Sequence, residues 1–175
     1  MAGNIAKAAR REKCKTVGVS LPVVNSNAAG TVQAIAEGVE LALYKDMRFK
    51  SEKDESTVVE SVSLIGFAGQ EAAIVKANII CSGVFLAREL VAAPANVIDS
   101  VTFADMAIEL AKTYSLDLKI LERADCEALN MGAFLGVARA SDIPPKFIHM
   151  IYKPAGTPRK RASISALSSD ILDLA

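Results

Sequence analysis

The chain has 175 residues, of which 51% are hydrophobic and 23% are charged, and its 20 basic residues balance its 20 acidic ones. This composition excludes a disordered chain, and zero net charge provides no overall field that would attract nucleic acid or an anionic membrane. Tryptophan is absent and aromatic residues amount to 5%, which argues against a base-stacking platform. A chain of this length holds one full domain or parts of two.

No membrane segment is expected. The longest apolar stretch, residues 79–87, is far shorter than the ~20 residues that a membrane-spanning helix needs. The N-terminal residues 1–15 are basic but have no apolar core, so they do not resemble a secretory signal. Two interpretations remain for them: part of a transit peptide, or an amphipathic helix. We favour the helix because Glu12 and the strand that follows fit a domain.

Cysteine usage indicates an intracellular protein. Cys14, Cys81 and Cys126 are far apart and odd in number, with no CxxC or Cys/His cluster. We therefore expect reduced thiols. Cys81 lies in an apolar run and is predicted to be a small core residue.

The first third of the chain has an α/β pattern. Residues 4–12 are predicted to be helical, and residues 15–24 form a buried type of strand that ends near Pro22. Asn and Ser in residues 25–30 are candidate N-caps. Apolar residues then recur at helical spacing and predict an amphipathic helix packed on a sheet: Val32, Ile35, Ala36, Val39 and Leu43.

A second strand is predicted at residues 58–67, after a run of charges at 48–57 that we interpret as a solvated loop. Strand, helix and strand in this order predict a parallel sheet with a crossover helix.

One long helix is predicted at residues 70–93, ended by Pro94. Gly83 inside it costs about 1 kcal/mol relative to alanine unless something packs closely there. The helix is apolar over much of its surface. Its apolar face is formed by Ile80, Val84, Ala87 and Val91, and beside that face lie Ile79, Leu86 and Leu90. Such a helix connects or separates two packed bodies.

The rest of the chain predicts a second α/β unit. A helix at 103–114 has Thr102 and Asp105 as a pair resembling a capping box. A strand at 116–123 and a short helix at 124–130 follow, then a glycine-punctuated turn and a Pro-Pro loop. The last predicted strand, at 146–153, is apolar on both faces, which is typical of a central strand covered on two sides. Two strands are too few for this unit to stand alone.

Candidate catalytic residues are few. The chain has no GxGxxG, GxxxxGK[ST], HExxH or GxSxG motif. His149, the one histidine, lies in the middle of a predicted strand, where a core or edge role is favoured over catalysis. Asp142 is the best-placed carboxylate, and we interpret it as a turn residue. The basic run 159–163 offers Ser163 as a phosphorylation site or forms a weak anion patch, but such runs are common in exposed tails.

Several stretches resemble one known family. Residues 87–97 (ARELVAAPANV) resemble the end of the interdomain helix of the leucine aminopeptidase family, the dinuclear-metal cytosol aminopeptidases, especially its plant members. Residues 42–53 look like the segment before the last strand of that family's N-terminal domain. Residues 119–154 resemble the start of its catalytic domain through specific groups: Met131-Gly132, Leu135-Gly136-Val137, Ser141, Pro144-Pro145, Phe147-Ile148 and Tyr152-Lys153. The resemblance covers about residues 3–154.

The resemblance implies a function and a mechanism. Members of the family remove N-terminal amino acids, often leucine, from peptides and usually assemble as hexamers. Two divalent ions, zinc, manganese or magnesium, polarise the scissile carbonyl and generate the attacking hydroxide. The family's ligand-bearing segments, V-G-K-G-(I/L)-T-F-D-S-G-G and N-T-D-A-E-G-R-L, lie downstream of the strand at 146–153, and this sequence contains neither. The resemblance therefore assigns no catalytic, cofactor-binding or metal-ligating residue here, and no cofactor to this chain.

The predicted fold class is α/β, in four parts. Residues 1–68 are a partial N-terminal α/β domain, 69–93 the long linking helix, 94–154 the start of an incomplete C-terminal catalytic domain, and 155–175 a divergent tail. We expect a truncated family member that is inactive alone, located in the cytoplasm or a plastid. The alternative is a non-catalytic module that assembles with full-length hexameric subunits. Nucleic-acid binding, which some bacterial members have, is disfavoured by the zero net charge.

Overall fold

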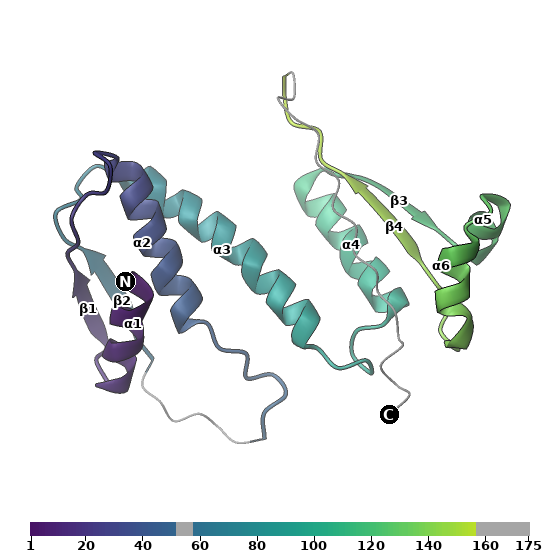
Figure 1. The fold of residues 1–175 in the computed structure, drawn as a ribbon, viewed down its shortest axis with the longest axis horizontal. Coiled ribbons are helices and arrows are strands. Elements are labelled where there is room, and N and C mark those ends of the chain that lie inside the picture. Colours follow the sequence, from purple (N-terminus) through teal and green to yellow (C-terminus); the bar gives the residue numbers. More distant parts are fainter. Residues whose placement is uncertain (52–57, 157–175) are drawn as a thin grey trace. The chain divides into compact units, whose positions relative to one another are not determined.

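The computed structural model describes residues 1–51 and 58–156, and it divides into two compact units, Met1–Ala92 and Ala93–Ala175. Unit 1 contains helices α1 (Ala2–Arg11), α2 (Ala28–Leu43) and α3 (Glu71–Ala92) and strands β1 (Thr16–Val19) and β2 (Ser61–Leu64) (Figure 1). Helix and strand alternate along the chain, as the α/β prediction requires.

The two strands of unit 1 pair in parallel, with Val17 opposite Val62 and Val19 opposite Leu64. The predicted parallel sheet with a crossover helix is confirmed. Both strands are shorter than predicted. After β1 the chain reaches Pro22, which has no N–H for a strand ladder. Asn25 and Ser26 then adopt positive φ angles of 52° and 55°, which no strand contains.

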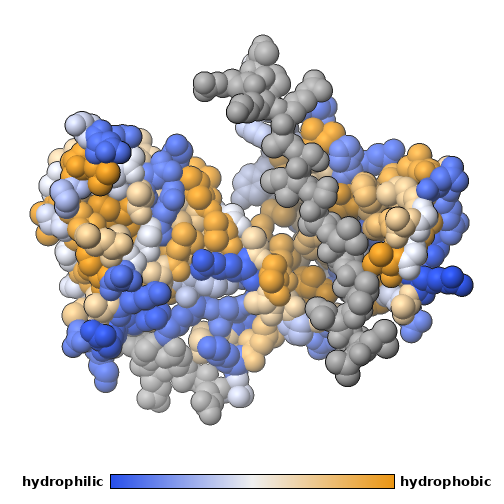
Figure 2. Space-filling model, viewed as in Figure 1, coloured by the Kyte–Doolittle hydropathy of each residue, from blue (hydrophilic) through white to orange (hydrophobic). Residues whose placement is uncertain are grey.

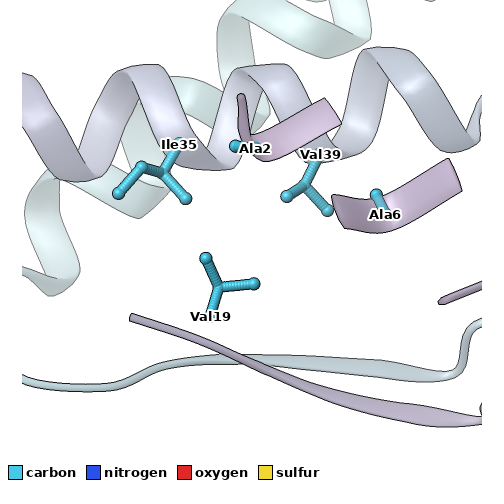
Figure 3. Close-up of a cluster of buried hydrophobic side chains, with 5 residues drawn as sticks. All are labelled: Ala2, Ala6, Val19, Ile35 and Val39. Carbon is cyan, nitrogen blue, oxygen red and sulfur yellow. The ribbon is translucent and has the colours of Figure 1, made fainter. Parts of the chain in front are cut away.

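The core of unit 1 lies between the sheet and two helices (Figure 3). Val19 of β1 points at Ile35 and Val39 of α2, and Ala2 and Ala6 of α1 close the cluster. Full burial of one Val or Ile side chain stabilises the fold by roughly 1.5–3 kcal/mol. The N-terminal segment is therefore an amphipathic helix of this unit, as we favoured.

Helix α2 buries the predicted apolar stripe. Val32, Ile35, Ala36 and Val39 are all buried, while Leu43 in the last turn is only half-buried. Its N-cap is Asn27, whose Oδ1 accepts a hydrogen bond from the backbone N–H of Gly30 at 2.8 Å. The cap satisfies one of the donors that the first turn leaves unpaired.

Helix α3 exists as predicted, and its buried row differs from the apolar face that the sequence indicates. The buried residues are Ala73, Ala77 and Cys81, a row of small side chains at i, i+4 and i+8, whereas Ile79, Ile80 and Val91 are exposed. Small residues let α3 approach α2 closely, so packing selected them over the larger apolar face. Cys81 is a core residue, as predicted, and burial raises the pKa of its thiol to about 11.

Unit 2 contains α4 (Ser100–Tyr114), β3 (Asp117–Leu121), α5 (Arg123–Ala128), α6 (Gly132–Val137), a short 3-10 helix (Ala138–Ala140) and β4 (Phe147–Ile151). Two local predictions were wrong. The capping box of α4 pairs Asp99 with Thr102, because Asp99 accepts from the backbone N–H groups of Val101 and Thr102. The stretch predicted as a glycine-punctuated turn is helix α6, since Gly132 and Gly136 both adopt helical geometry.

Strands β3 and β4 pair in antiparallel register, with Lys119 opposite His149. In the described residues β4 has β3 as its one partner, and its place as a covered central strand stays a prediction. Phe147, Ile148 and Met150 are half-buried, whereas His149 and Ile151 are exposed. The Phe147 ring meets that of Phe134 edge-on, with centroids 5.7 Å apart, and so joins β4 to α6.

Candidate functional site

The side chains that could support catalysis lie on different elements. His149 is exposed on β4 and Asp142 is exposed in the loop before it. His149 is thus an edge residue rather than a core one. The basic run 159–163, including Ser163, lies outside the described residues. Over residues 1–51 and 58–156, no three His, Cys, Asp or Glu side chains gather closely enough to hold a metal ion.

The lysines that flank β4 take part in ion pairs. Lys146 Nζ donates to both carboxylate oxygens of Glu122, at 2.6 and 2.7 Å. Lys153 pairs with Asp117 at the other end of the strand pair. Each lysine contacts a residue at one end of β3, and the register of the pair itself is that of the backbone ladder, Asp117 opposite Ile151 through Leu121 opposite Phe147. The ion pairs leave neither lysine aimed at a reaction centre.

In the described residues, the main feature without an assigned role is exposed apolar surface. On α3, Val75 is 57% exposed, Ile79 67% and Val91 87%. In unit 2, Ile151 and Tyr152 are exposed at the end of β4. Figure 2 shows apolar side chains at the surface of both units. Exposed apolar groups concentrated on one helix are typical of a surface that another protein segment covers.

One tertiary contact escaped the sequence prediction. The charge run 48–57 was interpreted as a solvated loop, but Arg48 at its start donates to the backbone carbonyl of Glu89 in α3, at 2.7 Å. Residues 52–57 lie outside the described part. The signal in the sequence was Asp46, two residues earlier, which pairs with Arg48 at 2.7 Å.

Both units match known sequences. Residues 1–53 match the N-terminal domain of the cytosol aminopeptidase family, and residues 85–165 match its catalytic domain. The chain belongs to the cytosol aminopeptidase family. The probable cytosol aminopeptidases of Nostoc punctiforme and Gloeothece citriformis are 58% and 57% identical to it over 164 residues, which are 93% of this chain. The chain spans about a third of the length of these relatives, at 33% and 34%.

Solved structures agree with this assignment. A tomato leucine aminopeptidase mutant is 35% identical to the chain and superposes with a TM-score of 0.78, over 91% of this chain and 33% of its own. The bottromycin maturation enzyme BotP, solved with manganese, is 26% identical, with a TM-score of 0.69 over 89% of this chain and 34% of its own. The α/β fold class is therefore that of the leucine aminopeptidases. No helix in the described part is long and apolar enough to cross a membrane.

Proposed function

We propose that residues 1–175 supply the N-terminal domain, the linking helix and the start of the catalytic domain of a leucine aminopeptidase, and that this polypeptide does not hydrolyse peptides by itself. The bounds of the parts are proposed from the sequence as residues 1–68, 69–93 and 94–154, with 155–175 as the tail, and the family matches at residues 1–53 and 85–165 support the first and third parts. Among residues 1–51 and 58–156, no three His, Cys, Asp or Glu side chains gather closely enough to hold a metal ion, which supports the inactivity. The complete enzyme would release N-terminal amino acids, leucine among them.

The proposed enzyme uses two divalent metal ions, as the manganese-bound relative suggests. The described residues do not fit such a centre, because bridging two ions takes several converging carboxylates and none converge here. The ligands are therefore proposed to come from protein segments other than residues 1–51 and 58–156. No catalytic, cofactor-binding or metal-ligating role is assigned to a residue of this chain.

A hydrolysis assay tests the inactivity. The purified polypeptide is incubated with a chromogenic leucyl amide and Mn²⁺ or Zn²⁺, beside the Nostoc relative as positive control. We expect turnover by the relative alone. Metal-dependent, chelator-sensitive hydrolysis that scales with the concentration of the 175-residue chain would disprove the proposal.

A second candidate function is assembly with full-length aminopeptidase subunits, with no role for nucleic acid or membrane. The exposed Val75 and Ile79 on α3 favour it, since both would gain from burial against a partner. The test is co-expression with a tagged full-length relative and native purification. We expect the chain to co-purify, and an Ile79→Glu variant to do so far less than the matched control Val23→Glu, which changes an exposed loop residue. Equal recovery of both variants would count against this surface.

The proposed location is intracellular, in the cytoplasm or a plastid. Fractionation of the source cells, with antibodies against the chain and against compartment markers, distinguishes the two. Recovery from culture medium would contradict both.

A further inference from the structure

The last turn of α2 lies beside the C-terminal part of α3, and neither helix has a basic residue in its own last turn. They pack side by side in unit 1 (Figure 1). A helix C-terminus leaves up to four backbone carbonyls without an intrahelical donor and carries a partial negative charge. Each of these ends is stabilised when a positive group reaches its unpaired carbonyls. The structure supplies those groups from outside each helix.

Two arginines cap the ends of the two helices from outside each helix. Arg88 of α3 donates through Nη1 to the carbonyl of Leu41, in the last turn of α2, at 3.3 Å. Arg48, in the loop after α2, donates through Nη2 to the carbonyl of Glu89, in the last turn of α3, at 2.7 Å. Each arginine thus satisfies an unpaired carbonyl of the neighbouring helix and places a full charge at its negative end.

The loop that carries Arg48 is held in place by two further contacts. Asp46 accepts from Arg48 Nε at 2.9 Å and from Nη2 at 2.7 Å, a bidentate pair that fixes the guanidinium plane. The Tyr44 ring stacks on Phe85 of α3 with centroids 4.7 Å apart, and Arg88 lies 5.3 Å from the Tyr44 centroid. The Tyr44 hydroxyl is buried without a hydrogen-bond partner, so the ring contacts hold this side chain and the hydroxyl does not.

An isolated surface ion pair would add little, because solvent screens it. Here the Asp46 side chain is 17% exposed and that of Arg48 42%, so solvent screens the pair in part, and the hydrogen bonds from Arg48 lower the pKa of Asp46 to about 2. The two hydrogen bonds to the ionised carboxylate keep Arg48 aimed at α3. The contacts join residues that are 41 positions apart, so they constrain tertiary structure rather than a local turn.

We propose that residues 44–48 form a strap that locks the last turn of α3 to unit 1, with Arg48 as the positioning residue. Ala92 ends both α3 and unit 1, so the strap fixes the point at which the chain leaves that unit. With the strap released, the last turn frays while the first half of α3, anchored by Ala73 and Ala77, stays folded.

Amide hydrogen exchange on the full 175-residue chain tests the strap. Wild type is compared with Arg48→Ala, Arg48→Lys and the matched control Arg11→Ala, which removes an exposed arginine from the end of α1. We expect Arg48→Ala to speed exchange at residues 88–92 by about fivefold and to leave residues 73–77 unchanged. Arg48→Lys keeps the charge but loses the two-pronged geometry, so we expect an intermediate rate.

Each exchange result either supports or overturns the proposal. Unchanged exchange at residues 88–92 in Arg48→Ala overturns the proposal. Equal acceleration at 73–77 and 88–92 also overturns it, because the variant then loosens the whole helix. If Arg48→Ala does not fold, Arg48→Lys decides: exchange as slow as in wild type overturns the strap, and selective acceleration at 88–92 supports it. Arg11→Ala must leave the exchange rates of both regions as in wild type. If Arg11→Ala speeds exchange at residues 88–92 as much as Arg48→Ala does, a specific role for Arg48 is overturned.

Discussion

Two helical glycines should respond in opposite ways to alanine, and the difference measures how tightly the N-terminal helix is packed. A Cβ at Gly3 in α1 would lie 2.8 Å from the carbonyl oxygen of Gly38 and 3.2 Å from the Cβ of Ala42. A Cβ at Gly83 in α3 would meet no atom within 4 Å. The same substitution therefore meets a rigid backbone at one site and open space at the other.

The magnitudes follow from two competing effects. Alanine is favoured over glycine inside a helix by about 0.5–1 kcal/mol, so Gly83→Ala should stabilise the chain by that amount. At Gly3 the same gain is smaller than the cost of overpacking, which is roughly 1–3 kcal/mol. We expect Gly3→Ala to destabilise unit 1 by about 1–2 kcal/mol net, because the obstructing atom belongs to the backbone of α2 and cannot rotate away.

Urea unfolding followed by circular dichroism at 222 nm is the assay. With an m-value of about 2 kcal/mol/M, a change of 1 kcal/mol moves the midpoint by about 0.5 M. We expect the midpoint to rise for Gly83→Ala and to fall for Gly3→Ala. A stabilised Gly3→Ala variant would refute the close approach of α1 and α2. A Gly83→Ala variant that is destabilised as much as Gly3→Ala would refute the open space on α3.

Three further predictions concern titratable and capping groups. Asp99→Ala should lower stability by about 1 kcal/mol because two backbone donors of α4 lose their acceptor, while Asp105→Ala should change urea stability little; equal losses would contradict the Asp99 cap. The thiol of Cys81, whose pKa is raised to about 11, should resist iodoacetamide at pH 8, while that of exposed Cys14 reacts. Labelling of the folded chain is read by peptide mass, and equal labelling of the two cysteines would contradict the burial of Cys81. The pKa of Asp46 is lowered from 3.8 to about 2, so its stabilising contribution is complete above pH 3.8 and is lost as the pH falls toward 2. The free energies of unfolding of the wild type and Asp46→Asn, measured over an acid titration, should therefore converge toward pH 2. A difference between the two free energies that stays constant down to pH 2 would count against this contribution.

Much of unit 1 could be predicted because its signals are local. The stripe on α2 is set by helical periodicity, which places Val32, Ile35 and Val39 on one face whatever the rest of the chain does. The parallel pairing of β1 and β2 follows from the helix between them, since a crossover connection of that length forces one direction. Membership of the family was likewise carried by short residue groups along the chain, and the profile matches confirmed it.

Other features were misjudged because they depend on competition between neighbours. Asp99 caps α4 in place of the predicted Thr102 and Asp105 pair, because its carboxylate accepts hydrogen bonds from two backbone donors at once. Gly132 and Gly136 predict a turn from the sequence, yet glycine is also tolerated in a helix when surrounding contacts hold it. The edge-on packing of Phe134 against Phe147 is such a contact, and it joins residues 13 positions apart.

The sequence by itself determined the α/β class, the order of most of the elements and the family, because periodicity and short motifs survive without tertiary information. Only the tertiary structure decided which face of α3 is buried: an apolar helix has several equivalent faces, and the close approach of α2 selected Ala73, Ala77 and Cys81. The same holds for Arg48, since a charged residue in a polar loop acquires a role only when folding brings an unpaired carbonyl 41 residues away within reach of its guanidinium.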